Sequence, residues 1–204
     1  MIRKAVFAIL ILGMLCLIKA GNGASSEASL EKAKNTLRSI AERKTALDEL
    51  RPVQDPDVLT DLAGLLRNLD EPVVLRAHIV EILIESKAEW AFLELKKLLD
   101  EASLPSETRR MALYGLWKRD PERIRMELMS LAKDRHEVPE LRVGAIGYLG
   151  QAEGPWPAGF WEHLHTSKSE AVPVRIAALG SMEELGLWTE NHHAALSQMI
   201  QDPS

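Results

Sequence analysis

Apolar residues recur in the same short pattern five times along the chain. In each copy an arginine is followed by apolar residues three, four and seven positions later, which is the spacing of one helix face. The arginines lie 33 residues apart, at Arg43, Arg76, Arg109, Arg142 and Arg175. The positions that follow them are apolar in every copy: Ala46, Leu47, Leu50, Ile79, Val80, Leu83, Ala112, Leu113, Leu116, Ala145, Ile146, Leu149, Ala178, Leu179 and Met182. A fixed period of this length predicts a repeat architecture.

A second apolar pattern follows the arginine segments, which predicts two helices per repeat. At the same period, Leu62, Leu65 and Leu66 align with Leu95, Leu98 and Leu99, with Leu128, Leu131 and Ala132, and with Trp161, Leu164 and His165. After Arg175 the pattern slips by two residues to Leu196, Met199 and Ile200, which indicates an insertion in "ELGLWTE". We predict arginine helices over 73–86, 106–118, 139–151 and 172–185, and partner helices over 56–68, 88–101, 121–134, 157–167 and 190–201. Proline, which is tolerated in a first helical turn, stands where the arginine helices begin, at Pro72, Pro105, Pro139 and Pro173.

The first 24 residues do not follow the repeat and predict a secretory signal peptide. A basic start precedes the apolar run "AVFAILILGMLCLI" and the small residues of "KAGNGASS". The apolar run of 14 residues is shorter than the ~20 residues that a membrane-spanning helix needs. Cleavage after Ala20, Gly23 or Ala24 would release a periplasmic or secreted protein. The alternative is an uncleaved N-terminal anchor, the one case in which we expect contact with a membrane.

The sequence therefore predicts three parts: a signal peptide (1–24), a capping helix or helix pair (25–52) and a repeat domain (53–202). The capping segment is polar but carries leucine and isoleucine at helical spacing, at Leu30, Leu37, Ile40, Leu47 and Leu50. Such polarity is expected at the end of a repeat array, because the outer face of a terminal repeat is in contact with water.

The segments "LDEPVVLRAHIVEIL", "ELRVGAIGYLG" and "VPVRIAALGSMEELG" resemble HEAT and HEAT-like repeats. They share an acid or small polar turn, a proline, and Val-Arg followed by small and aliphatic residues. The resemblance runs roughly from Arg43 to Ile200. It implies an all-α fold, a right-handed α-solenoid of about five helix pairs, with the arginine helices on the concave side. The family's turn aspartate is matched only by Asp70, because the other copies carry Ser103, His136 and Ser169, so a continuous aspartate–arginine ladder is not expected. We interpret the column arginines, Arg76, Arg109, Arg142 and Arg175, as structural.

Charge and composition exclude several classes of function. Loss of the signal peptide removes Arg3, Lys4 and Lys19 but no acid, which takes the formal net charge from −5 to −8. We expect no nucleic-acid partner, because phosphate binding depends on basic surfaces. Cys16 is the only cysteine, so the mature chain has no disulfide, thiolate nucleophile or cysteine metal ligand.

The sequence contains no nucleophile elbow, phosphate-binding loop or zinc-binding helix motif. His163 and His165 are two residues apart on a predicted helix, so their side chains diverge, and the pair His192-His193 has the same defect. His165 lies in a core column and is expected to be half-buried and hydrogen-bonded. We therefore expect no metal, no cofactor and no enzymatic activity.

Candidate binding residues lie beside the core face of the arginine helices. Positions two and five after the arginines hold His78 and Glu81, Met111 and Tyr114, Gly144 and Gly147, and Ala177 and Gly180. The bare glycines favour close helix packing, and a docked partner is the alternative. The predicted binding residues are Arg110, Tyr114, Trp117, Tyr148 and Glu81. For Trp117, the alternative is a core residue that fills the space left by Gly150.

Three tryptophans stand where the second helix of a repeat is predicted to begin: Trp90, Trp156 and Trp188. We interpret them as apolar staples that close the turn between two helices. The alternative is an aromatic rim for binding, because tryptophan is enriched among binding hot spots.

These features predict a non-catalytic protein–protein interaction scaffold or adaptor outside the cytoplasm, with a protein or peptide bound on its concave face. The alternative is a lyase-like or chaperone role for a chromophore-bearing or envelope protein, as in HEAT-like proteins of the phycobilin lyase type. The signal peptide argues against that alternative, since such chemistry belongs with cytoplasmic partners. A weaker third alternative is an accessory to a periplasmic enzyme.

Overall fold

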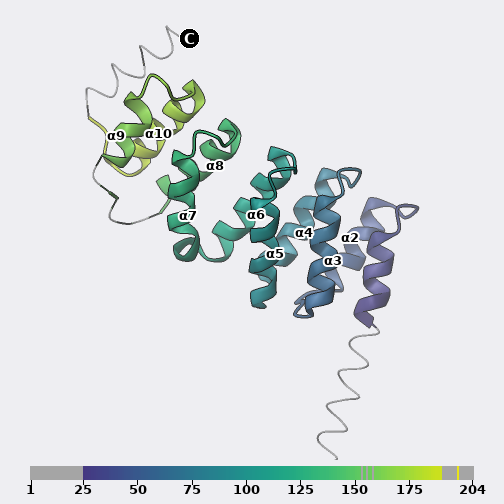
Figure 1. Ribbon diagram of the computed structural model, residues 1–204. Coiled ribbons are helices and arrows are strands. Elements are labelled where there is room, and N and C mark those ends of the chain that lie inside the picture. Colours follow the sequence, from purple (N-terminus) through teal and green to yellow (C-terminus); the bar gives the residue numbers. More distant parts are fainter. Residues whose placement is uncertain (1–24, 153, 155, 158, 190–196, 198–204) are drawn as a thin grey trace, which may run out of the picture. The chain divides into compact units, whose positions relative to one another are not determined.

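The computed structural model describes residues 25–152, 154, 156–157, 159–189 and 197. These residues form helices joined by short loops, with no strand among them, as predicted for an all-α fold (Figure 1). The predicted signal peptide and, apart from residue 197, the predicted helix over 190–201 lie outside the described residues. No helix in the described ranges is both long and apolar enough to cross a membrane. The chain divides into two compact units, Met1–Glu94 and Leu95–Ser204.

The first unit contains a helical segment over 25–34, α2 (Ile40–Asp48), α3 (Pro56–Arg67), α4 (Val73–Glu85) and the first residues of α5 (Glu89–Asp100). Helix α2 begins in a capping box, in which the Ser39 hydroxyl accepts from the Glu42 amide and the Glu42 carboxylate accepts from the Ser39 amide. Helix α4 packs against α2 and α3. The core of this unit consists of nearly inaccessible aliphatic side chains, among them Leu47, Leu59, Leu62, Leu66, Leu75, Ile79 and Leu83.

The second unit contains the rest of α5, followed by α6 (Ser106–Arg119), α7 (Pro121–Lys133), α8 (Pro139–Gly150), α9 (Phe160–Thr166) and α10 (Val172–Glu184). Helix α8 is central, because it packs against α6, α7 and α10, and α10 also packs against α9. The leucine, isoleucine and alanine columns predicted from the sequence supply much of its core, including Leu113, Leu116, Ala145, Ile146, Leu149, Ala178 and Leu179.

The predicted helix limits agree with the observed ones to within two residues, except at α9. That helix was predicted from residue 157 but begins at Phe160. Gly159 has a φ of 70°, in the left-handed region that an α-helix cannot contain, so the helix begins only after it. A second glycine, Gly186, ends α10: its φ is 68°, and the Leu187 amide donates to the Met182 carbonyl at 2.8 Å. This is the C-terminal cap in which glycine is favoured.

The column arginines lie near the starts of their helices and are largely shielded from solvent. Arg76, Arg109 and Arg142 are buried, and Arg175 is partly buried. In four of the five arginines, Nε donates a hydrogen bond to the carbonyl oxygen ten residues earlier, at the end of the preceding helix. The pairs are Arg43 with Ala33 (2.6 Å), Arg109 with Leu99 (2.8 Å), Arg142 with Ala132 (3.1 Å) and Arg175 with His165 (3.0 Å). The side chain thus satisfies a carbonyl group that the helix end leaves without an intrahelical partner.

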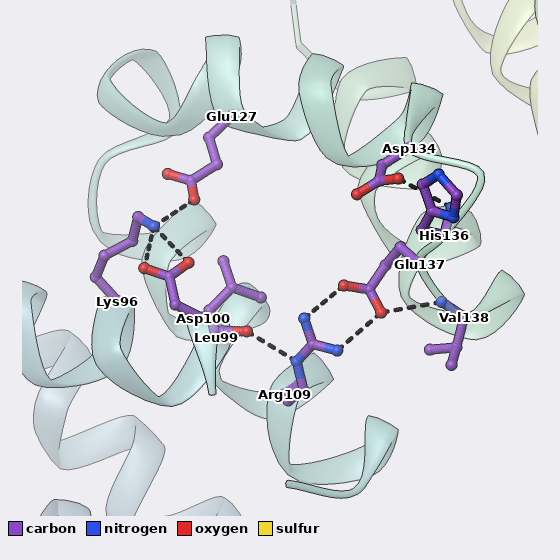
Figure 2. A network of polar contacts seen from close by, with 9 residues as sticks. All are labelled: Lys96, Leu99, Asp100, Arg109, Glu127, Asp134, His136, Glu137 and Val138. Carbon is purple, nitrogen blue, oxygen red and sulfur yellow. Dashed lines mark hydrogen bonds and ion pairs between the residues drawn. The ribbon is translucent and has the colours of Figure 1, made fainter. Parts of the chain in front are cut away.

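Three of these arginines also bind a glutamate 28 residues later, in the turn before the next arginine helix. The guanidinium of Arg109 holds both carboxylate oxygens of Glu137, at 2.8 and 2.5 Å (Figure 2). Arg43 binds Glu71 and Arg142 binds Glu170, each at 2.6 Å. As expected, no continuous aspartate–arginine ladder forms among the described residues, but an acid stands one residue later, as glutamate, in three of the four turns. The fourth turn carries Leu104 at that position, and Asp70 itself is exposed.

Candidate binding surface

Three of the predicted binding residues form an aromatic cluster in the second unit. Tyr114 and Trp117 lie on α6, and Tyr148 lies on the adjacent helix α8. The rings of Trp117 and Tyr148 are stacked, with centroids 4.8 Å apart and planes inclined by 14°. The Tyr114 ring lies 6.4 Å from that of Tyr148, tilted by 44°. Such pairs stabilise a surface by about 0.5–1.5 kcal/mol each beyond the burial of area, so the cluster is a defined feature rather than three independent side chains.

The members of the cluster differ in exposure. Tyr114 is 39% exposed, whereas Trp117 and Tyr148 are half-buried. Burial raises the pKa of the Tyr148 phenol above its usual range, and the positive charge of Arg110 opposes that shift. Tyr148 therefore stays neutral at neutral pH, and Tyr114 is the ring that a partner can reach.

Two cations flank the exposed tyrosine on α6. Lys118 places its Nζ 4.6 Å from the centroid of the Trp117 ring and 5.8 Å from that of Tyr114, within the range of a cation–π contact. Arg110 is exposed one turn before Tyr114. Within the described residues neither cation forms an ion pair with a carboxylate. Lys96 is different, because its Nζ lies 2.6 Å from Glu127 and is also bonded to Asp100 (Figure 2).

The glycines of α8 have two different roles. A Cβ at Gly150 would lie 2.5–3.0 Å from the side chain and Cα of Ser181 on α10, so close helix packing explains this glycine. A Cβ at Gly147 would meet nothing within 4 Å, and one at Gly144 would make only an ordinary contact of 3.7 Å with Leu113. Close packing was thus the wrong interpretation of Gly147, which leaves open space beside Tyr148. Gly180 on α10 is open in the same way.

The alternative in which Trp117 fills the space left by Gly150 is wrong, because another residue lies there. The neighbour of Gly150 is Ser181, whose hydroxyl donates to the Ile146 carbonyl at 3.0 Å. Trp117 packs on Tyr148 instead, and its Nε1 is buried without a hydrogen-bond partner. The Trp117 ring therefore packs between α6 and α8 on Tyr148 and does not fill the space at Gly150.

Glu81 belongs to the first unit and joins a polar network there. Its carboxylate lies 3.2 Å from Nδ1 of His78, whose Nε2 lies 2.8 Å from Asp48 on α2. The guanidinium of Arg51 contacts Asp48, Glu81 and Glu85. His78, predicted to face away from the core, is buried at 9% exposure. These contacts connect α2 to α4 and give Glu81 a local structural role.

The tryptophans at the helix starts behave differently from one another. Trp156 packs on Phe160 and Trp161 in the first turn of α9, with centroids 6.2 and 5.3 Å apart, which fits a staple. Trp90 is 40% exposed and donates from Nε1 to Thr60 of α3 at 3.0 Å, so it connects two partner helices. Trp188 is partly buried.

The histidines do not form a metal site in the described part of the chain. His165 is buried at 5% exposure, deeper than the half-buried position expected for it, and its carbonyl accepts from Arg175, whereas His163 is exposed. No group of three histidine, cysteine, aspartate or glutamate side chains among the described residues is arranged to hold a metal ion. His192 and His193 lie outside those residues.

The chain matches no protein-family model and none of the curated proteins in sequence. Evidence on function therefore comes from the chain's own residues. Among the predicted binding residues, the structure brings together Tyr114, Trp117 and Tyr148, with the charge of Arg110 beside them. Lys118, which was not predicted as a binding residue, completes the surface. Its position one turn after Tyr114 was the available signal.

Proposed function

We propose that this protein is a non-catalytic interaction scaffold that acts outside the cytoplasm. In this proposal the chain is a right-handed α-solenoid of about five HEAT-like helix pairs with a period of 33 residues. The arginine helices line its concave side, and a protein or peptide partner binds there. The tripartite start of the sequence supports export.

The recurrence of one set of contacts supports the repeat. Arginines spaced 33 residues apart donate to a carbonyl ten residues before them, and three of them bind a glutamate 28 residues after them. Equivalent bonds at equivalent offsets are expected when each repeat is one structural unit packed on the next.

The observation that carries the binding role is the surface formed by α6 and α8. The exposed Tyr114 ring lies beside the Tyr148 ring, on which Trp117 stacks. Arg110 and Lys118 flank Tyr114 without a carboxylate partner among the described residues, and Gly147 on the adjacent helix α8 leaves open space. Tyrosine, tryptophan and arginine are the residues most enriched at binding hot spots. A merely solvated helix face has no need of three packed aromatic rings.

Site-specific photo-crosslinking in cells that make the protein tests this proposal. The photoreactive residue p-benzoylphenylalanine replaces Tyr114 in the full chain, and the matched control carries it in place of Met126. Met126 is 73% exposed and lies on α7, which is a partner helix and not an arginine helix.

We expect a discrete covalent adduct with another protein from position 114 and none of the same mass from position 126. Mass spectrometry of the adduct identifies the partner. Absence of any adduct at 114, or equal adducts at both positions, would contradict the proposed binding face.

A further inference from the structure

The cations and the exposed ring on α6 are evenly spaced. Arg110, Tyr114 and Lys118 are four residues apart and all three are exposed. At a rise of about 1.5 Å per residue, successive members of this stripe are about 6 Å apart along the helix axis. The stripe therefore presents positive charge, aromatic ring and positive charge along about 12 Å.

The two cations of the stripe stand in an acidic protein. The protein carries a net negative charge, and many of its other cationic side chains have carboxylate partners, as in Lys34 with Asp61 and Arg135 with Glu170. Neither cation of the stripe has such a partner in the described residues. Charge complementarity therefore favours an acidic partner at a site whose centre is apolar.

An extended peptide has a matching spacing. Its residues advance about 3.3 Å each, and alternate side chains point to the same face, so side chains at i, i+2 and i+4 lie about 6.6 Å apart. From this match we propose, resting on the proposed function, that α6 binds an extended segment of the form acidic–x–aromatic–x–acidic. The central ring stacks on Tyr114 and the two carboxylates pair with Arg110 and Lys118.

The surroundings of Tyr114 accommodate such a segment. Helix α8 packs against α6, and its Gly144 and Gly147 carry no side chains. The space at Gly147 is open, so no side chain at that position obstructs a strand bound on α6. The Lys118 ammonium already lies over the Trp117 and Tyr114 rings, so it needs little movement to meet a carboxylate above them.

The test uses three labelled peptides and the full chain, with binding measured by fluorescence anisotropy at low salt. The probe contains Glu-Gly-Trp-Gly-Glu between Gly-Ser flanks. Its isomer, Gly-Glu-Trp-Glu-Gly, has the same composition and charge but moves both acids next to the ring. A helical probe carries glutamates eight residues apart with tryptophan midway, which tests whether the partner is a helix instead.

The probe is expected to bind at least threefold more tightly than its isomer and than the helical peptide. Arg110→Gln and Lys118→Gln should each weaken the probe by up to about fivefold, and the double variant by more than either, since a single exposed ion pair contributes up to about 1 kcal/mol. Lys168→Gln removes the same charge from an exposed loop of the same unit and should leave probe binding unchanged. Circular dichroism of each variant confirms that its helix content is retained.

Equal binding of probe and isomer, tighter binding of the helical peptide, or no effect of the two α6 substitutions would overturn the inference. None of these results affects a protein adduct formed at position 114, so the scaffold proposal would stand. Loss of that adduct, by contrast, refutes the scaffold proposal itself.

Discussion

Substitution of Glu170 by glutamine tests whether the arginine–glutamate pairs hold neighbouring helices together. Glu170 is 5% exposed and accepts from Arg142 at 2.6 Å and from Arg135 at 2.8 Å. Arg142 is 3% exposed, so the substitution leaves a buried guanidinium without its counterion. Arg135 is nearly half exposed, and its pair contributes little by comparison.

The expected loss of unfolding free energy is about 2–3 kcal/mol. Breaking a buried ion pair typically costs ~3–5 kcal/mol, and we expect a smaller loss of about 2–3 kcal/mol here because the glutamine side chain can still accept a hydrogen bond from Arg142. Arg142 also keeps its bonds to the Ala132 carbonyl, at 3.1 and 3.0 Å. For a domain of this size the loss corresponds to a fall in Tm of about 4–12 °C.

Urea denaturation followed by circular dichroism at pH 7 measures this loss. Glu183→Gln is the matched control, because Glu183 is exposed on α10 and should change stability by less than ~0.5 kcal/mol. A loss at Glu170 no larger than that of the control would refute the structural role of the pair. Replacement of both partners, Arg142→Met with Glu170→Leu, should be less destabilising than Glu170→Gln alone, because no buried charge remains unpaired.

Three further predictions concern acid stability, helix packing and the repeat. Hydrogen bonds from Arg109 lower the pKa of Glu137, and bonds from Arg142 and Arg135 outweigh burial to lower that of Glu170. The stabilisation from both carboxylates should be complete above the unfolded pKa of about 4.3 and lost as pH falls through the lower folded values, so the urea midpoint should fall between pH 7 and pH 3. The double variant Glu137→Gln with Glu170→Gln should show a smaller fall, and an unchanged fall would contradict this prediction. Gly150→Ala should cost about 1–3 kcal/mol because its Cβ meets Ser181, whereas Gly147→Ala should stabilise by up to ~1 kcal/mol, and equal effects in thermal melts would contradict the assigned packing. Deletion of residues 109–141 removes one period and places Arg142 ten residues after Leu99 and 28 before Glu170, so the variant should still melt cooperatively as a helical protein. Deletion of residues 109–136, which removes 28 residues, breaks these offsets and should abolish the cooperative melt. A cooperative melt of the second variant and not of the first would exclude the 33-residue period.

Much of the helical framework could be predicted because it depends on local periodicity. The arginine helices were placed correctly at both ends, since proline marks their starts and apolar residues at three, four and seven positions after the arginine mark their buried face. The start of α9 was missed because a single left-handed glycine, Gly159, interrupts an otherwise helical pattern. Such a glycine can be recognised only by its backbone conformation.

Contacts between distant residues were harder to predict. The glutamates that bind the column arginines do recur, at Glu71, Glu137 and Glu170, but comparison with the aspartate position one residue earlier concealed them. The meaning of the glycines depends on which residue faces them: Gly150 faces Ser181 across two helices, and nothing in the spacing of the sequence distinguishes it from Gly147. Likewise Glu81 shares a helix position with Tyr114, yet His78 and Arg51 engage it.

The affinity of the crosslinked partner for the Tyr114→Ala variant tests the binding role most directly. Tyr114 is 39% exposed, so its truncation should cost only the pairing with Tyr148 and part of a buried ring and should leave the variant folded, whereas removal of Trp117 would also disturb its stacking on Tyr148. If Tyr114 is the central contact, titration calorimetry should show affinity reduced at least tenfold, since truncation of a central aromatic contact typically costs about 2 kcal/mol or more. Unchanged affinity of a variant that is folded at the temperature of the titration would show that the partner does not bind at the aromatic cluster of α6 and α8.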